Sequence, residues 1–65
     1  MTLYDVLEVA TGTIVINTKQ TNVLTWHGGE YECDECFNSE FLNKKVKNIY
    51  ASDNYGLVVY IEGFN

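Results

Sequence analysis

The sequence contains no arginine and no proline, and four lysines are its only basic residues besides a single histidine. Nine Asp and Glu residues outnumber the lysines and give the 65-residue chain a formal net charge of −5. Such a chain repels phosphate backbones, so direct binding of nucleic acid through a basic patch is disfavoured. An acidic, aromatic-bearing domain is suited instead to docking on a basic protein surface, including one whose normal ligand is nucleic acid.

Long apolar runs and numerous cysteines are also missing. No stretch approaches the roughly 18 apolar residues of a membrane span, and the start "MTLYDVLEVA" lacks the basic region and apolar core of a signal peptide. Two cysteines are too few for the disulfide framework of a small secreted domain. We therefore expect a cytoplasmic chain that forms one small domain over residues 1–65, with Cys33 and Cys36 as thiols unless a metal holds them.

The strongest pattern that is present lies in residues 46–61, "VKNIYASDNYGLVVYI". Two β-branched and aromatic runs flank residues 52–56, which predicts a hairpin with a glycine-containing loop. In the second run Leu57, Val59 and Ile61 point one way and Val58 and Tyr60 the other, so neither face is polar and the strand should lie inside a sheet. In the first run, the spacing between its apolar residues does not fit one face, which indicates a bulge or a start still within a helical turn.

The N-terminal residues predict a short amphipathic helix over residues 2–10. Thr2 is a candidate N-cap with Asp5 at the acidic position of a capping box, and Gly12 is placed to end the helix in a left-handed conformation. One helical face collects the apolar residues Leu3, Val6, Leu7 and Ala10.

A second hairpin is predicted from "TIVINT" at residues 13–18 and "NVLTWH" at residues 22–27, ended by Gly28 and Gly29. Its expected core face consists of Ile14, Ile16, Leu24 and Trp26. Residues 28–38 should form a solvated loop because four carboxylates crowd it. Ser39 then caps a helical turn in which Phe41 and Leu42 look inward.

These elements predict an α+β fold, with the N-terminal helix on one face of a four-stranded, mainly antiparallel sheet and a short helical turn between the second and third strands. One helix covers only one side of such a sheet. The other side would carry considerable apolar surface, from Val15, Val23, Tyr50, Val58 and Tyr60. We therefore expect a homodimer or a partner interface there. Phe64, beyond the last strand, either folds back on the core or stays mobile.

Two groups of residues are the candidate partner-binding sites. The first is the acidic loop, with Glu30, Tyr31, Glu32, Asp34 and Glu35, and the second is the outer sheet face, with Tyr50, Val58 and Tyr60. Aromatic residues among carboxylates, here Trp26, Tyr31 and Phe37, resemble an interface anchor with a polar rim. The structural alternative is that Trp26 fills the core while the other two rings tether the loop.

A metal or redox site is the alternative from another class. His27, Cys33 and Cys36 lie within ten residues, and C-x-x-C is half of a zinc-knuckle spacing, but a closed zinc site needs four ligands. Redox chemistry is disfavoured because Glu32, Asp34 and Glu35 would raise the thiol pKa values. Neither a pocket-building loop nor a group to orient the His27 imidazole is evident, so we expect neither an enzyme nor a bound cofactor. A sponge for a small nucleotide would need cations, which are sparse outside Lys44, Lys45 and Lys47.

The order of these features resembles a family of very short, mostly uncharacterised α+β proteins of phages and prophages. The resemblance rests on "TLYDVLEV", on Trp26 followed by Gly28 and Gly29, on "FLNKKVKNIYA", in which residues 42–49 fit an L-L/N-x-x-V-x-x-I segment, and on the closing "GLVVYI". It covers nearly the whole chain, but its motifs are hydrophobic spacings that carry no chemistry. Members often have a proline before the helical turn, where this chain has "CDECF".

The resemblance implies a genomic context and no catalytic or binding residues. Small phage accessory proteins often act by binding one host protein, and inhibitors of bacterial defence systems are a prominent class among them. Together with the acidity, this predicts a non-enzymatic protein binder, in one version an inhibitor that blocks a basic nucleic-acid-binding groove by charge mimicry.

Overall fold

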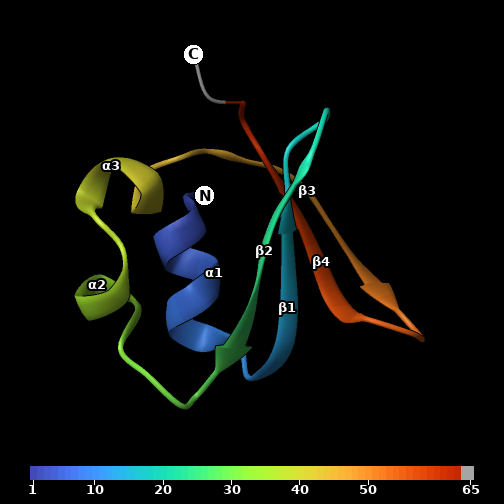
Figure 1. Cartoon of the computed structure of the whole chain (residues 1–65), viewed down its shortest axis with the longest axis horizontal. Helices are drawn as coiled ribbons and strands as arrows, with labels where there is room; N and C mark the ends of the chain where they lie inside the picture. Colours follow the sequence, from blue (N-terminus) through green and yellow to red (C-terminus); the bar gives the residue numbers. More distant parts are fainter. Residues whose placement is uncertain (64–65) are drawn as a thin grey trace.

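A four-stranded sheet with all of its helices on one side forms the molecule (Figure 1). The computed structural model describes residues 1–63, so the alternatives for Phe64 lie outside the described residues. The elements follow in the order α1 (Leu3–Val9), β1 (Gly12–Asn17), β2 (Asn22–Gly28), α2 (Cys33–Cys36), α3 (Ser39–Leu42), β3 (Val46–Ser52) and β4 (Gly56–Ile61). The predicted α+β class and its placement of the N-terminal helix are confirmed.

The sheet has the strand order β2-β1-β4-β3. Both predicted hairpins form as antiparallel pairs, and they join through β1 and β4, which run parallel at the centre. Ile14 lies opposite Trp26 in β2 and Leu57 in β4, so one face of the sheet is apolar across several strands. The two central strands are the most buried part of the fold, with Ile14, Ile16, Val59 and Ile61 almost fully enclosed.

Helix α1 begins as the sequence predicts. Thr2 is the N-cap, and the reciprocal bonds of a capping box join it to Asp5, whose carboxylate accepts from the Thr2 backbone N–H at 2.9 Å. The start of the helix is also tied to the entry of β3, because Leu3 N–H donates to the Lys44 carbonyl and Val46 N–H to that of Met1. The helix ends at Val9, and its C-cap residue Ala10 is extended. Gly12 does have a positive φ, of 84°, but it lies at the start of β1 and does not cap the helix, so the predicted left-handed cap was wrong.

The acidic segment between β2 and β3 is more ordered than predicted. Residues of the expected solvated loop form α2, a short helix whose first turn contains Asp34 and Glu35. Carboxylates near the N–H groups at the start of a helix are favourable, which offsets their mutual repulsion. Helix α3 forms as predicted, but its cap is Asn38, whose side-chain oxygen accepts from Phe41 N–H at 2.9 Å.

Strand β3 contains the irregularity that its sequence suggested. Its register with β4 shifts between Val46 and Asn48, so Lys47 is the extra residue, and Val46 shares the helix-covered side with Ile49. In the β3–β4 loop the Ser52 hydroxyl accepts from two backbone N–H groups, and Gly56 adopts a φ of 86°. A side chain at Gly56 would collide with the Thr13 carbonyl. Glycine is therefore required at this position for two reasons, the positive φ and the close approach of the Thr13 backbone.

The face of the sheet opposite the helices has no covering element within residues 1–63 (Figure 1). The prediction for this face requires two corrections. Val23 packs against the core on the helix side, because a register shift opposite Ile16 and Asn17 changes its direction. Val15 and Val58 do lie on the open face but are already buried, since each is flanked by side chains of neighbouring strands. The expected apolar surplus is therefore much smaller than the sequence suggested.

No helix in the described part of the chain is long and apolar enough to cross a membrane.

Candidate functional site

An acidic cleft lies between α1 and the segment that leads from β2 into α2. It has a volume of about 250 Å³, and four of its lining residues carry carboxylates while two carry phenols. The lining comprises Tyr4, Leu7, Glu8, Gly29, Glu30, Tyr31, Glu32, Cys33 and Asp34. No lysine belongs to this lining, so a cationic group that enters the cleft meets only negative and neutral partners. We call it the acidic cleft below.

Two elements build the cleft from opposite sides. Helix α1 presents Tyr4 and Glu8, which are four residues apart and therefore neighbours on the helix surface. A hydrogen bond between their side chains raises the pKa of Tyr4, and the Glu8 and Asp34 charges raise it further. The other side follows Gly29, whose positive φ of 88° turns the chain out of β2 and places Glu30, Tyr31 and Glu32 along the rim.

The floor of the cleft includes Cys33. This side chain is 6% exposed and belongs to the hydrophobic core, whereas Cys36 is exposed at the other end of α2. Burial raises the pKa of the Cys33 thiol, and the neighbouring Asp34 charge raises it further. Like-charge repulsion at this thiol was predicted, but desolvation is the larger cause. Cys33 is therefore a protonated core side chain at neutral pH and a poor nucleophile.

A series of aromatic rings supports the rim. Trp26 of β2 is buried, its ring centroid is 5.0 Å from that of Phe37, and Phe37 lies 4.9 Å from Phe41 of α3. Tyr31 approaches the same indole with a centroid distance of 6.4 Å, yet 70% of its surface stays exposed. Trp26 thus fills the core and Phe37 fastens the loop, as the structural alternative predicted, whereas Tyr31, for which the same tethering role was predicted, is mostly exposed and available for contact.

The structure brings the predicted site residues together in two groups on opposite sides of the sheet. Glu30, Tyr31, Glu32 and Asp34 line the acidic cleft, and Glu35 is exposed on α2 outside that lining. Tyr50 and Tyr60 lie on the open face as a stacked pair, with their hydroxyl oxygens 3.5 Å apart, and Val58 is 4% exposed beside them. The predicted contact of these three residues with a partner stays a prediction.

Sequence reasoning missed Tyr4 and Glu8. The helical periodicity of residues 2–10 was used only to find the buried stripe, and Tyr4 and Glu8 lie beside that stripe at an i, i+4 spacing. Such a spacing of a phenol and a carboxylate is a signal that could have placed both on the rim of a site.

The alternative metal or redox site does not assemble. Among residues 1–63, no group of three or more His, Cys, Asp and Glu side chains is placed to share a metal ion. His27 lies opposite Thr13 and follows Trp26 in β2, so its side chain points to the open face, while Cys33 is part of the core on the helix side. The same separation removes the Cys/His pair that a nucleophilic mechanism would need.

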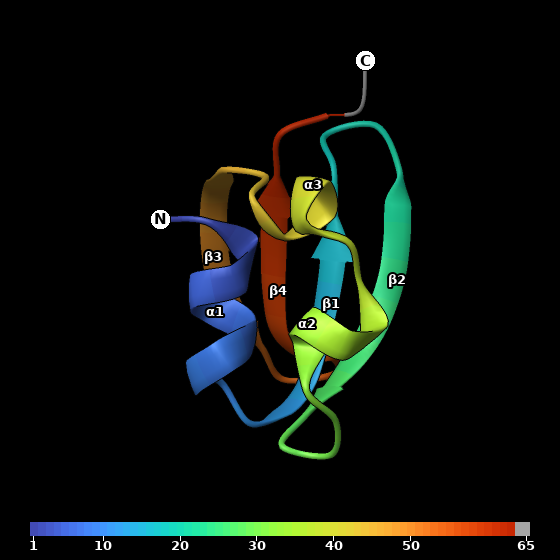
Figure 2. The same cartoon turned by 90° about the vertical axis from the view of Figure 1, so that its left-hand side faces the viewer.

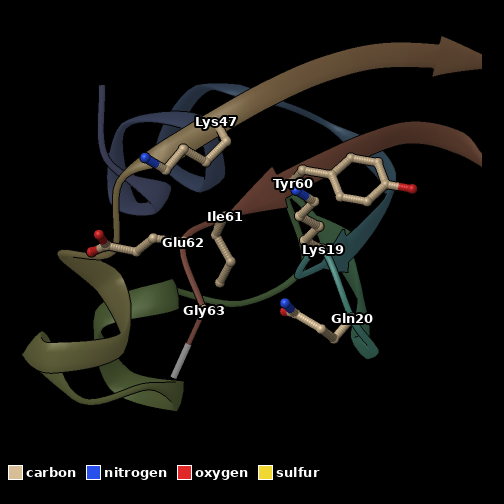
Figure 3. Close-up of a pocket in the computed structure, with 7 residues that line it drawn as sticks. All are labelled: Lys19, Gln20, Lys47, Tyr60, Ile61, Glu62 and Gly63. Carbon is tan, nitrogen blue, oxygen red and sulfur yellow. The ribbon is translucent and has the colours of Figure 1, made fainter. Parts of the chain in front are cut away.

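A second and larger hollow, of about 740 Å³, lies where β4 ends beside the tip of the first hairpin (Figure 3). Lys47 and Glu62 extend on one side of Ile61, and Lys19 and Gln20 lie on the other. Of the three lysines that a nucleotide sponge would use, only Lys47 lines this hollow, where Lys19 joins it. Both lysines share the hollow with the Glu62 carboxylate, which already accepts a hydrogen bond from Lys45 N–H, so this hollow is not selective for an anion.

No protein-family model matches the chain, and neither the curated proteins nor the solved structures include a match to it.

Proposed function

We propose that this chain is a non-enzymatic binding protein that holds a basic segment of a protein partner in the acidic cleft. The observation that carries the proposal is the lining itself, in which Glu8, Glu30, Glu32 and Asp34 surround one concave site without a lysine. The exposed phenol of Tyr31 stands at the same rim.

The chemistry of this lining favours an arginine or lysine side chain as the occupant. A guanidinium group pairs with carboxylates through two parallel hydrogen bonds, and it also stacks on the face of a tyrosine ring. The cleft offers both kinds of group within one site. A net charge of −5 adds a long-range attraction that speeds the encounter with a basic surface.

The resemblance to short phage and prophage proteins extends the proposal to a biological role. The partner is then a protein of the bacterial host, met in the cytoplasm, and one specific version is a defence protein whose basic nucleic-acid-binding groove is blocked by the acidic surface. In that version the carboxylates stand in for the phosphates of the normal ligand.

The test compares two variants that remove the same charge from different places. Glu8→Gln, Glu32→Gln and Asp34→Asn together remove three of the four carboxylates that line the cleft, and Glu30 is left intact because it adjoins β2. Glu35→Gln, Glu40→Gln and Asp53→Asn remove three charges from exposed positions outside the cleft lining and form the matched control. Both variants and the wild type are used as baits in a bacterial lysate, with captured proteins identified by mass spectrometry.

We expect one host protein to be captured by the wild type and by the control but not by the cleft variant. With that purified protein, the cleft variant should bind about tenfold or more weakly, because several charge-assisted contacts are lost at once. Equal losses of binding in both variants would mean that the net negative charge, and not the cleft, is responsible. Unchanged binding in both would move the site to the open face, where Tyr50→Ser is the next variant.

A further inference from the structure

The two edges of the sheet are protected to very different degrees. Strand β3 begins with a bulge at Lys47, follows Lys44 and Lys45, and has its first residue bonded to the Met1 carbonyl. Bulges, lysines and covering segments are the devices by which proteins prevent an edge strand from pairing with another chain. Strand β2, with the sequence NVLTWHG, contains no proline, no lysine and no carboxylate.

The outer side of β2 is open for pairing. In Figure 2 it is the outermost strand, and no other element lies beyond it. Among residues 1–63, its backbone has no backbone partner outside the ladder with β1. The register shift in that ladder falls at the start of β2, and from Leu24 to Gly28 the pairing with β1 is regular, so these five successive residues have the uninterrupted strand backbone that another strand can join.

We propose that a second copy of this chain pairs with the edge of β2, strand against antiparallel strand, about a two-fold axis through Thr25. The product is a continuous eight-stranded sheet with all helices on one side. Thr25 is the middle residue of β2, so the regular residues 24–26 of both copies pair with one another, and the irregular start of each strand lies opposite His27 and Gly28 of the other. A two-fold axis makes every contact occur twice, which a self-complementary strand requires.

The side chains of β2 are complementary to themselves in this register. Leu24 lies level with Trp26 of the second copy on the helix side, where Leu24 is only half-buried in the single chain. Aromatic and aliphatic residues that face each other across strands form a stabilising pair. Thr25 meets its own symmetry mate on the open face, and threonine pairs across strands are also favourable.

Charges at the two ends of β2 are complementary in the same register. The hairpin tip before β2 carries Lys19, and the segment after β2 carries Glu30, both exposed. Antiparallel pairing about Thr25 directs the hairpin tip of one copy towards the segment that follows β2 in the other, so Lys19 and Glu30 bring opposite charges to both ends of the interface. Because β2 itself carries no Asp, Glu or Lys, two chains of charge −5 can meet along it without like charges in contact.

The mass of the protein in solution tests this proposal. At about 100 µM, sedimentation equilibrium of the wild type should give twice the chain mass of 7.4 kDa. Thr25→Lys places two like charges directly opposite each other at the axis and should return the protein to a monomer. Asn48→Lys is the matched control, an exposed open-face position on the other edge strand, and should remain dimeric.

A charge exchange tests the register. Lys19→Glu and Glu30→Lys should each raise the dimer dissociation constant by roughly fivefold, because each replaces opposite charges by like charges at both ends of the interface. The double variant restores opposite charges at both ends and should recover the wild-type constant. Circular dichroism should be unchanged throughout, since both side chains are exposed.

Three results would overturn the proposal. A wild type that stays monomeric at about 100 µM excludes the dimer. A Thr25→Lys protein that remains dimeric excludes the β2 edge, and loss of the dimer in Tyr50→Ser alone assigns the contact to the open face. A double charge variant with a higher dimer dissociation constant than either single variant excludes this register.

Discussion

The two faces of the sheet have different chemistry, although the same strands build both. On the helix side, Ile14, Ile16 and Val59 are fully buried. On the open side, the paired positions hold only Thr, Val, Asn, Ser, Tyr, Gly and one His, without a single Asp, Glu or Lys. Seven of the nine acidic residues lie in the helices or in the segment that leads into α2, namely Asp5, Glu8, Glu30, Glu32, Asp34, Glu35 and Glu40.

Most of the acidic residues therefore lie on the helix side of the sheet, and the open face is uncharged apart from His27. The helix side provides both the core and the acidic cleft, so the basic partner proposed above would approach the layer that stabilises the fold. The open face is neutral and shields its own valines through neighbouring strands, which leaves Tyr50, at 45% exposure, as its main exposed ring. In the dimer that we propose, a second copy joins the uncharged β2 edge and not this face.

The largest effect should come from matched truncations on the two sides of β4. Val59→Ala removes a fully buried side chain on the helix side and should lower the free energy of unfolding by about 2–3 kcal/mol, the sum of lost burial and a residual cavity. Val58→Ala, one residue earlier, should cost only about 1 kcal/mol, because solvent and the Tyr50 ring can relax into the space. Urea denaturation measures both, and equal losses would contradict the asymmetry.

The two cysteines allow the same comparison within α2. Cys33→Ser introduces a hydroxyl at a core position and should cost about 1–2 kcal/mol, whereas Cys36→Ser at an exposed position should change stability by less than about 0.5 kcal/mol. With a disulfide reagent at neutral pH, Cys36 should react quickly and Cys33 slowly, because burial raises its pKa. Loss of the fold in both Ser variants, together with bound zinc in the wild type, would instead support the metal alternative.

A smaller effect is expected where α1 begins over the helix side of the sheet. Thr2→Ala removes the N-cap oxygen and should lower the free energy of unfolding by about 1 kcal/mol. The Thr2 N–H lowers the pKa of Asp5, so the stabilisation by Asp5 is present above the pKa of the unfolded chain and is lost as the pH falls through the lower folded value. Thermal unfolding of Asp5→Asn should therefore differ from that of the wild type at neutral pH, and the difference should disappear in acid.

Local patterns predicted most of the fold because the relevant forces act between near neighbours. The capping box at Thr2, both hairpins and the bulge before Ile49 follow from short-range spacing, and the structure confirms them. The parallel pairing of β1 with β4 joins residues more than forty positions apart, for which no local pattern exists. Val23 was assigned to the wrong face because alternation does not reveal a register shift in advance.

The candidate site was only half predictable for the same reason. Glu30, Tyr31, Glu32 and Asp34 lie together in the sequence, so their charge pattern marks them at once. Tyr4 and Glu8 complete the cleft from a helix about twenty-five residues earlier, and only the packing of α1 beside that segment brings them there. Sequence reasoning therefore found the charged loop but not that it forms one wall of a cleft.

The smallest expected effect concerns the tyrosine pair of the open face. A hydrogen bond with Tyr50, and a second with Asn17, lowers the pKa of Tyr60, while the same contact raises that of Tyr50. Tyr50→Phe should therefore raise the pKa of Tyr60 towards its ordinary value and leave the stability of the fold almost unchanged. Absorbance titration of tyrosinate measures the pKa.

Tyr55→Phe in the β3–β4 loop is the control, because it removes one exposed phenol and leaves the pair intact. If the pKa of Tyr60 were the same in Tyr50→Phe as in the wild type, the two hydroxyl groups would not be hydrogen-bonded to each other. If they are, a partner that covers this face would change the surroundings of the pair, and its binding would appear as a change in the pKa values of Tyr50 and Tyr60. A partner in the acidic cleft, on the other side of the sheet, would leave the pKa values of Tyr50 and Tyr60 unchanged and shift that of Tyr4, so a titration that follows each tyrosine separately by NMR, with and without the partner, distinguishes the two faces.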